Sequence, residues 1–156
     1  MEFREVIDRR RTVRDFSDRS VPAGIVDEAI GAAFKAPSYN HLREWHFVIV
    51  DDPALKRSLT ETEEMSESVS EETKAALLAA YEKTASDMYL EAIPKQRRMI
   101  LDAPLVIAAA YLPKTPVERA ARVYDLNCLA SVWCGIENLL LALAERDIFG
   151  VTFIPK

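Results

Sequence analysis

The sequence has 156 residues, of which 49% are hydrophobic, which is enough to bury one core and too little for two independent domains. Its formal net charge of -5 gives no overall positive field, so general attraction to nucleic acid or to an anionic membrane is not expected. We therefore expect one domain over residues 1–156.

The amino-terminal residues 1–14 are charged and lack the apolar run of a secretory signal. No stretch approaches the roughly 18 uninterrupted apolar residues of a membrane span. A cytoplasmic protein that does not span a membrane is therefore expected. Cys128 and Cys134 fall on different faces of one expected helix, which predicts two free, buried thiols and neither a disulfide nor a metal site.

Two helices are predicted in the first quarter of the chain. The apolar spacing within residues 3–7 predicts a short helix that ends near Arg10 or Arg11. A second helix is expected to begin at Val21-Pro22 and to end before Pro37, because proline disfavours the continuation of a helix. It leads into a loop over residues 36–44.

Three short apolar runs are typical of strands. Residues 46–50 are rich in β-branched side chains and end at Asp51-Asp52-Pro53, and residues 105–111 lie between two prolines. Residues 149–156 are a third strand candidate. The first two runs are predicted to be interior strands, with the third close to the end of the chain.

The regions between these strands are predicted to be mainly helical. An acidic run over residues 61–72 is interpreted as a solvated excursion, and an alanine-rich helix is expected over residues 73–89. Residues 117–145 are predicted to form one long helix, whose part from Leu126 to Leu143 is apolar on nearly every face. Such a helix must be covered all round, and we expect its own sheet to cover one side and a second subunit the other.

The first group of chemically informative residues is Arg9-Arg10-Arg11-Thr12-Val13-Arg14-Asp15-Phe16. Several guanidinium groups and one hydroxyl at the end of a helix can surround a phosphate with charge-assisted hydrogen bonds. The alternative is a basic surface turn that is neutralised by nearby acidic side chains. A nucleic-acid-binding turn is a further alternative, which the acidic balance of the chain disfavours.

The second group is the loop Ala36-Pro37-Ser38-Tyr39-Asn40-His41-Leu42-Arg43-Glu44-Trp45. Its polar side chains lie directly before a predicted buried strand, where ligands commonly bind. By itself the pattern is ambiguous, because His41 is also typical of an ordinary loop residue and Trp45 of a core anchor.

Together, these two groups resemble the amino-terminal signature of the nitroreductase family. That signature has an arginine pair, a hydroxyl residue, a basic residue and phenylalanine, followed by Pro-Ser-x-x-Asn-x-Gln-Pro-Trp before a strand. Glu137-Asn138-Leu139 also resembles the Gln-Asn-Leu of the family's central helix. The resemblance runs from about Phe3 to the end of the chain and is loose over residues 52–101.

The resemblance implies an α+β fold with a central mixed or antiparallel sheet flanked by helices and a long central dimer helix. It implies an obligate homodimer in which FMN lies between the arginine turn of one subunit and the loop of the other. The cofactor-binding residues that it implies are Arg10, Arg11, Thr12, Arg14, Pro37, Ser38, Tyr39, His41 and Arg43. No catalytic protein group and no metal are expected.

The activity implied by the resemblance is a ping-pong transfer of electrons from NAD(P)H through FMN to a small acceptor such as a nitroaromatic or a quinone, and the family also includes deiodinating flavoproteins. His41, Arg43 and Glu44 depart from the family's Asn, Gln and Pro. The family's further carboxyl-terminal helix and strand are not found in residues 1–156. The alternative is a flavin-free, non-catalytic dimeric module on the same scaffold.

Overall fold

The computed structural model describes residues 2–61 and 68–154, and its contacts divide the chain into two compact units. The first unit consists of residues 2–13, 20–49 and 107–150. The second consists of residues 14–19, 50–61, 68–106 and 151–154. The prediction that residues 1–156 form one domain stays a prediction.

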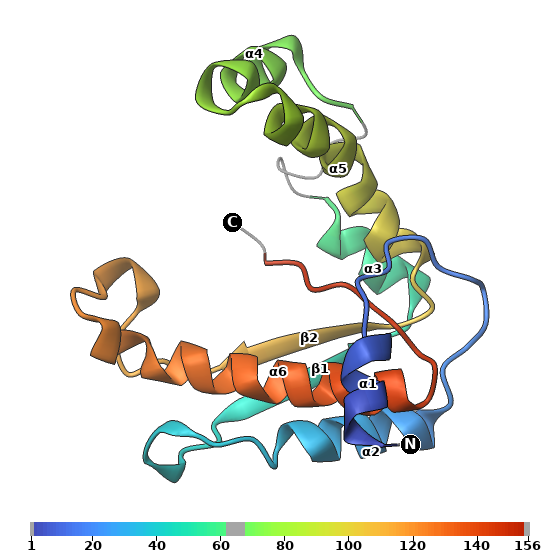
Figure 1. Ribbon diagram of the computed structural model, residues 1–156, viewed down its shortest axis with the longest axis vertical. Coiled ribbons are helices and arrows are strands. Elements are labelled where there is room, and N and C mark those ends of the chain that lie inside the picture. The colour runs from blue at the N-terminus through green and yellow to red at the C-terminus, as the bar shows by residue number, and fades with distance from the viewer. Residues whose placement is uncertain (1, 62–67, 155–156) are drawn as a thin grey trace. The chain divides into compact units, whose positions relative to one another are not determined.

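The first unit is a helical layer packed on a small sheet (Figure 1). Its helices are α1 (Phe3–Arg9), α2 (Ala23–Ala33) and α6 (Asn127–Glu145). Strands β1 (Trp45–Val50) and β2 (Val106–Tyr111) form the two-stranded antiparallel sheet, and three 3₁₀ turns complete the unit. These turns are η1 (Tyr39–His41), η2 (Val117–Arg119) and η3 (Val123–Leu126).

The core of this unit lies where α2 and α6 pack together above the strands. Ala29 and Ala33 of α2 are buried against Leu139 and Leu143 of α6, and side chains from both strands pack beneath them. Small residues on α2 allow the two helices to approach closely. Gly135 of α6 continues this contact, since a β-carbon there would lie 3.2 Å from the ring of Trp45 and 3.3 Å from the Ala33 carbonyl oxygen.

The second unit contains helices α3 (Pro53–Leu59), α4 (Glu71–Ala80) and α5 (Lys83–Asp102). Lys56 of α3 is 7% exposed, and its ammonium group donates to the carbonyl oxygen of Ala103, 2.8 Å away, just beyond the end of α5. Ser86 is completely buried and donates to the Leu77 carbonyl oxygen at 3.1 Å. The unit is therefore held together by side chains that satisfy the carbonyl groups of helix ends.

The structure confirms the first two helices and the first two strands that the sequence predicts. The expected helix over residues 73–89 is wrong, because the chain breaks at Tyr81 and begins α5 after Glu82. The long helix over residues 117–145 is also wrong in its first part, where two 3₁₀ turns precede α6.

The third predicted strand is not observed in the described part of residues 149–156. Residues 151–154 form no strand, and Gly150 makes only an isolated parallel bridge with Thr12. A strand needs a neighbouring strand for its backbone hydrogen bonds, and no described segment pairs with residues 151–154 as a strand. Residues 62–67, half of the acidic run over residues 61–72, lie outside the described residues, whereas Glu71 and Glu72 lie in the first turn of α4.

Two further findings concern α6. Both cysteines are free, as predicted, but Cys134 is exposed in this chain, so the expectation that both thiols are buried is wrong. Residues 123–145 are long and apolar enough, by length and composition only, to cross a membrane, and a core helix passes the same test. Only 28% of the most apolar window is buried within the described chain, which leaves much of this helix uncovered.

Candidate functional site

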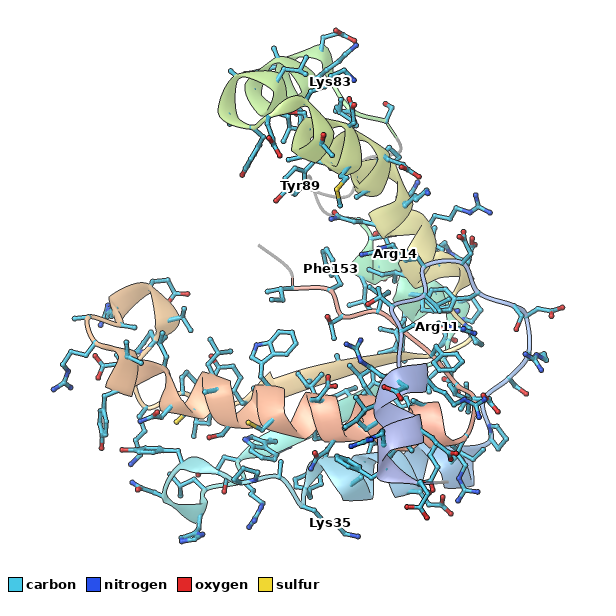
Figure 2. The ribbon with its side chains drawn as sticks, in the orientation of Figure 1. Arg11, Arg14, Lys35, Lys83, Tyr89 and Phe153 are labelled. Carbon is cyan, nitrogen blue, oxygen red and sulfur yellow. The ribbon has the colours of Figure 1, made fainter. Side chains whose placement is uncertain are left out.

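The arginine turn, residues 9–12, follows α1 and lies beside the carboxyl-terminal half of α6. Arg10 is the capping residue directly after α1, and its Nε lies 3.5 Å from Oε1 of Glu137. The Arg11 guanidinium, which Figure 2 labels just beyond α1, lies 4.5 Å from the centre of the Phe149 ring. Two of the predicted phosphate-binding side chains are therefore positioned by α6 and by the segment that follows it.

The backbone of this turn is fixed, and its donors remain accessible. Thr12 forms a bridge with Gly150, and the Val13 amide donates to the Gly150 carbonyl oxygen at 3.1 Å. Arg9 is paired with Asp147, whereas the side chain of Arg10 is 37% exposed. Among the described residues no hydrogen bond engages the Thr12 hydroxyl. The turn thus offers a guanidinium group and a hydroxyl to an anion from outside the chain.

Arg14, the fourth basic residue predicted for this site, belongs to the second unit. Its side chain is exposed, as Arg10 and Arg11 are in the first unit. The structure therefore brings Arg10, Arg11 and Thr12 together on one turn, while the role of Arg14 stays a prediction.

The loop over residues 37–43 is held against the amino-terminal half of α6. The Tyr39 amide donates to Oγ of Ser131, 2.9 Å away, and that hydroxyl in turn donates to the Asn127 carbonyl oxygen at 2.6 Å. Asn40 and His41 adopt left-handed backbone angles, with φ of 50° and 57°. This conformation is uncommon for residues with a side chain, and it is typical of tight turns near functional sites.

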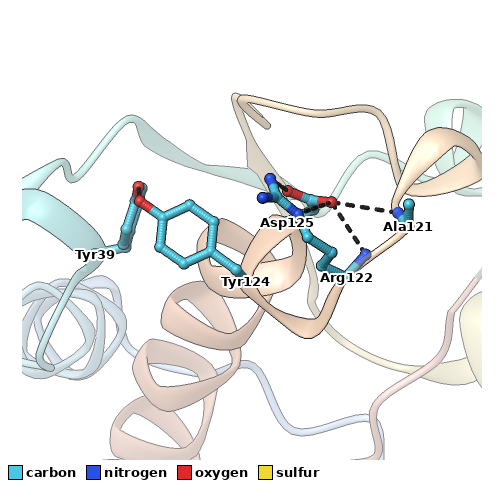
Figure 3. A network of polar contacts seen from close by, with 5 residues as sticks. All are labelled: Tyr39, Ala121, Arg122, Tyr124 and Asp125. Atoms are coloured by element: carbon cyan, nitrogen blue, oxygen red, sulfur yellow. Dashed lines mark hydrogen bonds and ion pairs between the residues drawn. The ribbon is translucent and has the colours of Figure 1, made fainter.

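Tyr39 is the centre of an aromatic and cationic cluster. Its hydroxyl forms a hydrogen bond with that of Tyr124, and the two rings lie edge to face at 5.6 Å (Figure 3). The Lys114 ammonium lies 4.8 Å from the centre of the Tyr39 ring. The hydrogen bond with Tyr39 raises the pKa of the Tyr124 hydroxyl above its usual value. This cluster fixes the loop to η3 as well as to α6.

A second set of contacts holds η3 in place (Figure 3). The Asp125 carboxylate accepts hydrogen bonds from the Arg122 guanidinium at 2.9 Å and from the Arg122 and Ala121 amides. These donors, the Arg122 side chain first, lower the pKa of Asp125. These hydrogen bonds close the turn that carries Tyr124.

The remaining loop residues have no such fixed environment. Oγ of Ser38 is buried and has no hydrogen-bond partner among the described residues. A buried hydroxyl without a partner is unfavourable, so this atom is a candidate for a donor or acceptor supplied from outside the chain. Pro37, His41 and Arg43 are exposed.

One chain does not bring the arginine turn and the loop together. The loop contacts Ser131, whereas the turn contacts Glu137 and residues beyond the end of α6. Along a helix, Ser131 and Glu137 are about 9 Å apart, so the two groups contact different parts of α6. A site shared by two subunits stays a prediction.

Several residues of these clusters were not found from the sequence. Ser131, Lys114 and Tyr124 carry no motif, and only the fold brings them to residue 39. Among the described residues no group of three or more His, Cys, Asp or Glu side chains could hold a metal ion. The site in the described chain is thus one of guanidinium, hydroxyl and aromatic groups.

The fold is α+β, and the exposed arginine turn beside its central helix presents donors that suit a phosphorylated ligand. The model of the Nitroreductase family matches residues 7–151 of this chain, so the chain belongs to the nitroreductase family. This match includes every residue that the sequence predicts for the cofactor site.

The chain is similar to several curated deiodinases. Iodotyrosine deiodinase 1 of Mus musculus is 39% identical over 161 residues, which cover 99% of this chain and 52% of that protein. The human protein is 38% identical over the same shares of both chains. Iodotyrosine deiodinase of Haliscomenobacter hydrossis is 38% identical over 66 residues, 42% of this chain and 30% of its own length. The chain thus spans about half the length of the mammalian relatives.

Solved structures confirm the fold. An iodotyrosine deiodinase bound to FMN and 3-iodo-L-tyrosine superposes with a TM-score of 0.74 at 23% identity, over 99% of this chain and 75% of that one. A nitroreductase of Bacteroides fragilis with bound FMN gives a TM-score of 0.59 at 22% identity, over 94% and 66%. FMN, the cofactor that the sequence predicts, is therefore bound in structures with this fold.

Proposed function

We propose that this chain is part of an FMN-dependent oxidoreductase that passes electrons from NAD(P)H to a small aromatic acceptor by a ping-pong mechanism. The observation that carries the proposal is the arginine turn, where Arg10, Arg11 and Thr12 present cationic and hydroxyl donors on one fixed segment. Forked guanidinium donors suit the geometry of a phosphate. When bound, FMN supplies the hydride and electron transfer that no described side chain provides.

The residues of this chain would bind and orient the cofactor. Arg10 and Arg11 hold the phosphate by charge-assisted hydrogen bonds, and the ring of Phe149 limits the motion of the Arg11 guanidinium. The family resemblance gives Arg14 a place beside the pyrimidine edge of the flavin ring, where a fixed positive charge stabilises negative charge.

We further propose that the protein is a homodimer with two shared sites. The uncovered apolar surface of α6 is the kind of face that a second copy buries, and one chain leaves the turn and the loop apart. In the dimer, Ser38, Tyr39 and His41 of one subunit would reach the flavin held by the other. The unpartnered hydroxyl of Ser38 supports this arrangement. A cytoplasmic location remains part of the proposal.

Reductive dehalogenation of a halogenated phenol is a second candidate reaction. It is favoured by the deiodinase relatives, which match 99% of this chain at 38 to 39% identity. Reduction of a nitroaromatic or a quinone remains the first candidate from the sequence. The two reactions share the cofactor site and differ in the acceptor, so they are separated by product analysis.

The cofactor is tested by its absorbance. Purified protein should be yellow, with a band at about 450 nm that follows the protein through gel filtration. Arg10→Ala and Arg11→Ala should lose retained FMN, while Arg19→Ala, an equal change of charge at an exposed site, should retain it. A colourless wild-type protein that binds no added FMN and sizes as a dimer would support the flavin-free module instead.

The shared site is tested by mixing variants. Arg11→Ala and His41→Asp chains are expected to bind little FMN as separate homodimers. A heterodimer of the two places both changes in one site and leaves the other site intact, so it should bind one FMN per dimer. Equal loss of FMN in the heterodimer and in both homodimers would contradict a site built from two subunits.

The acceptor is tested with loaded protein and stoichiometric reductant in the absence of oxygen. Release of iodide from 3-iodo-L-tyrosine would support dehalogenation, and conversion of a nitroaromatic to its hydroxylamine without iodide release would support the first candidate. Comparison of NADH, NADPH and dithionite as reductants then identifies the electron donor. Reduction by dithionite alone would contradict the proposed use of NAD(P)H.

A further inference from the structure

Arg10 and Arg11 are held in different ways, although both are predicted to bind the same phosphate. Arg11 lies over the neutral ring of Phe149, 4.5 Å from its centre. Arg10 is paired with an anion, since its Nε lies 3.5 Å from the Glu137 carboxylate. The contact of Arg11 with Phe149 places no carboxylate beside an approaching phosphate. The contact of Arg10 with Glu137 does place one there.

The contact between Arg10 and Glu137 is of a kind that an incoming anion can displace. Strong charge-assisted hydrogen bonds are about 2.7 to 2.9 Å long, and the 3.5 Å separation here is well beyond that range. The side chains of Arg10 and Glu137 are 37% and 50% exposed, so both can exchange their contact for water. Exposed pairs of this kind contribute little to stability.

We infer that Glu137 occupies the phosphate position on Arg10 until FMN binds, and that its negative charge lowers the affinity of the site for the phosphorylated flavin. This inference rests on the proposed function. The FMN phosphate carries close to two negative charges near neutral pH, so it is repelled by a carboxylate that lies within a few ångströms of its own binding residue. Riboflavin lacks that phosphate and is not repelled.

The test is the affinity of the flavin-stripped full chain for FMN and for riboflavin, measured by quenching of flavin fluorescence. Glu137→Gln removes the charge and keeps the shape of the side chain. FMN should bind about two- to fivefold more tightly, the range expected when one exposed charge is removed. Riboflavin affinity should stay unchanged. At about 1 M salt, where the screening length falls to about 3 Å, the difference for FMN should largely vanish.

Two controls separate a specific effect from a general change of charge. Glu28→Gln makes the same change of net charge in the same unit, but Glu28 is paired with Arg146, so FMN affinity should not rise. In an Arg10→Ala background, Glu137→Gln should give clearly less gain than in the wild type, because its partner at the phosphate is gone. A full gain in that background would overturn the assignment to Arg10.

The inference fails if Glu137→Gln leaves FMN affinity unchanged or weakens it while the wild type binds FMN normally, since Glu137 would then support Arg10 or be neutral. It also fails if riboflavin gains as much as FMN. Those results leave the proposed function standing. Absence of FMN binding in the wild type and in every variant overturns the proposed function and this inference with it.

Discussion

The backbone amide of Tyr39 donates a hydrogen bond to Oγ of Ser131 at 2.9 Å, which ties the loop of the candidate site to the central helix. Ser131 is 8% exposed, so the bond is shielded from water. A single small hydroxyl on the central helix thus holds the backbone of the loop at Tyr39. The contact leads to the first of four predictions.

Ser131→Ala should destabilise the protein, because the Tyr39 amide loses its acceptor in a partly buried place. The expected loss in the free energy of unfolding is about 1 to 3 kcal/mol, measured by urea denaturation. Retained FMN should decrease as well. Ser58→Ala, which removes an exposed hydroxyl on α3, is the control and should change stability by less than about 0.5 kcal/mol. Equal effects of the two substitutions would contradict this account.

Gly135 and Gly31 should respond in opposite ways to alanine. A β-carbon at Gly31 of α2 meets nothing within 4 Å, so Gly31→Ala should stabilise the helix by about 0.5 to 1 kcal/mol. At Gly135 the new methyl group would press on the buried Trp45 ring and on a backbone carbonyl. Overpacking there should outweigh the gain in helix propensity and lower the melting temperature. A similar rise in both variants would show that Trp45 can move aside.

Lys56→Met should weaken the second unit without removing apolar packing. The ammonium group donates to the carbonyl oxygens of Ala103 and Leu101, at 2.8 Å and 3.4 Å. Methionine preserves most of the side-chain volume and leaves both carbonyl groups without this donor, at a cost of about 1 to 3 kcal/mol. Hydrogen exchange should increase at the end of α5, and Lys56→Arg should restore much of the protection. Unchanged exchange in Lys56→Met would be evidence against this role.

Asp52 should make the stability of α3 depend on pH in the acidic range. Its carboxylate accepts hydrogen bonds from the Leu55 and Ala54 amides at 2.9 Å and 2.7 Å, and these bonds lower its pKa from the ordinary 3.8. Because the folded pKa is the lower one, the contribution is complete well above pH 3.8 and is lost as the pH falls through the folded value.

Asp52→Asn keeps an oxygen for the cap and does not titrate. The variant should therefore lose less stability than the wild type when thermal unfolding is followed from about pH 5 down to about pH 2. Glu61→Gln, at an exposed carboxylate beyond α3, should not flatten the profile. Parallel pH profiles for the wild type and Asp52→Asn would argue against the N-cap as the cause.

Local patterns predicted those elements whose boundaries are set by nearby residues. The helix that ends at Arg9 and the helix before Pro37 follow from apolar spacing and from proline, and the strand from Trp45 follows from its β-branched run. The break at Tyr81 could not be predicted in this way, because no proline or glycine lies near it in the sequence. At this break, the buried hydroxyl of Ser86 donates to the carbonyl oxygens of Leu77 and Tyr81. This contact joins the end of α4 to the first turn of α5.

By itself, the sequence determined the family and supplied the two groups of candidate site residues and the expectation of a partner on the central helix, because motifs and hydrophobic periodicity are local properties. The tertiary structure alone decided which side chains hold those groups in place. Glu137 and Phe149 reach the arginine turn, and Ser131 and Tyr124 reach Tyr39, only because α6 passes both. Such contacts join residues far apart in the chain, and no spacing rule encodes them.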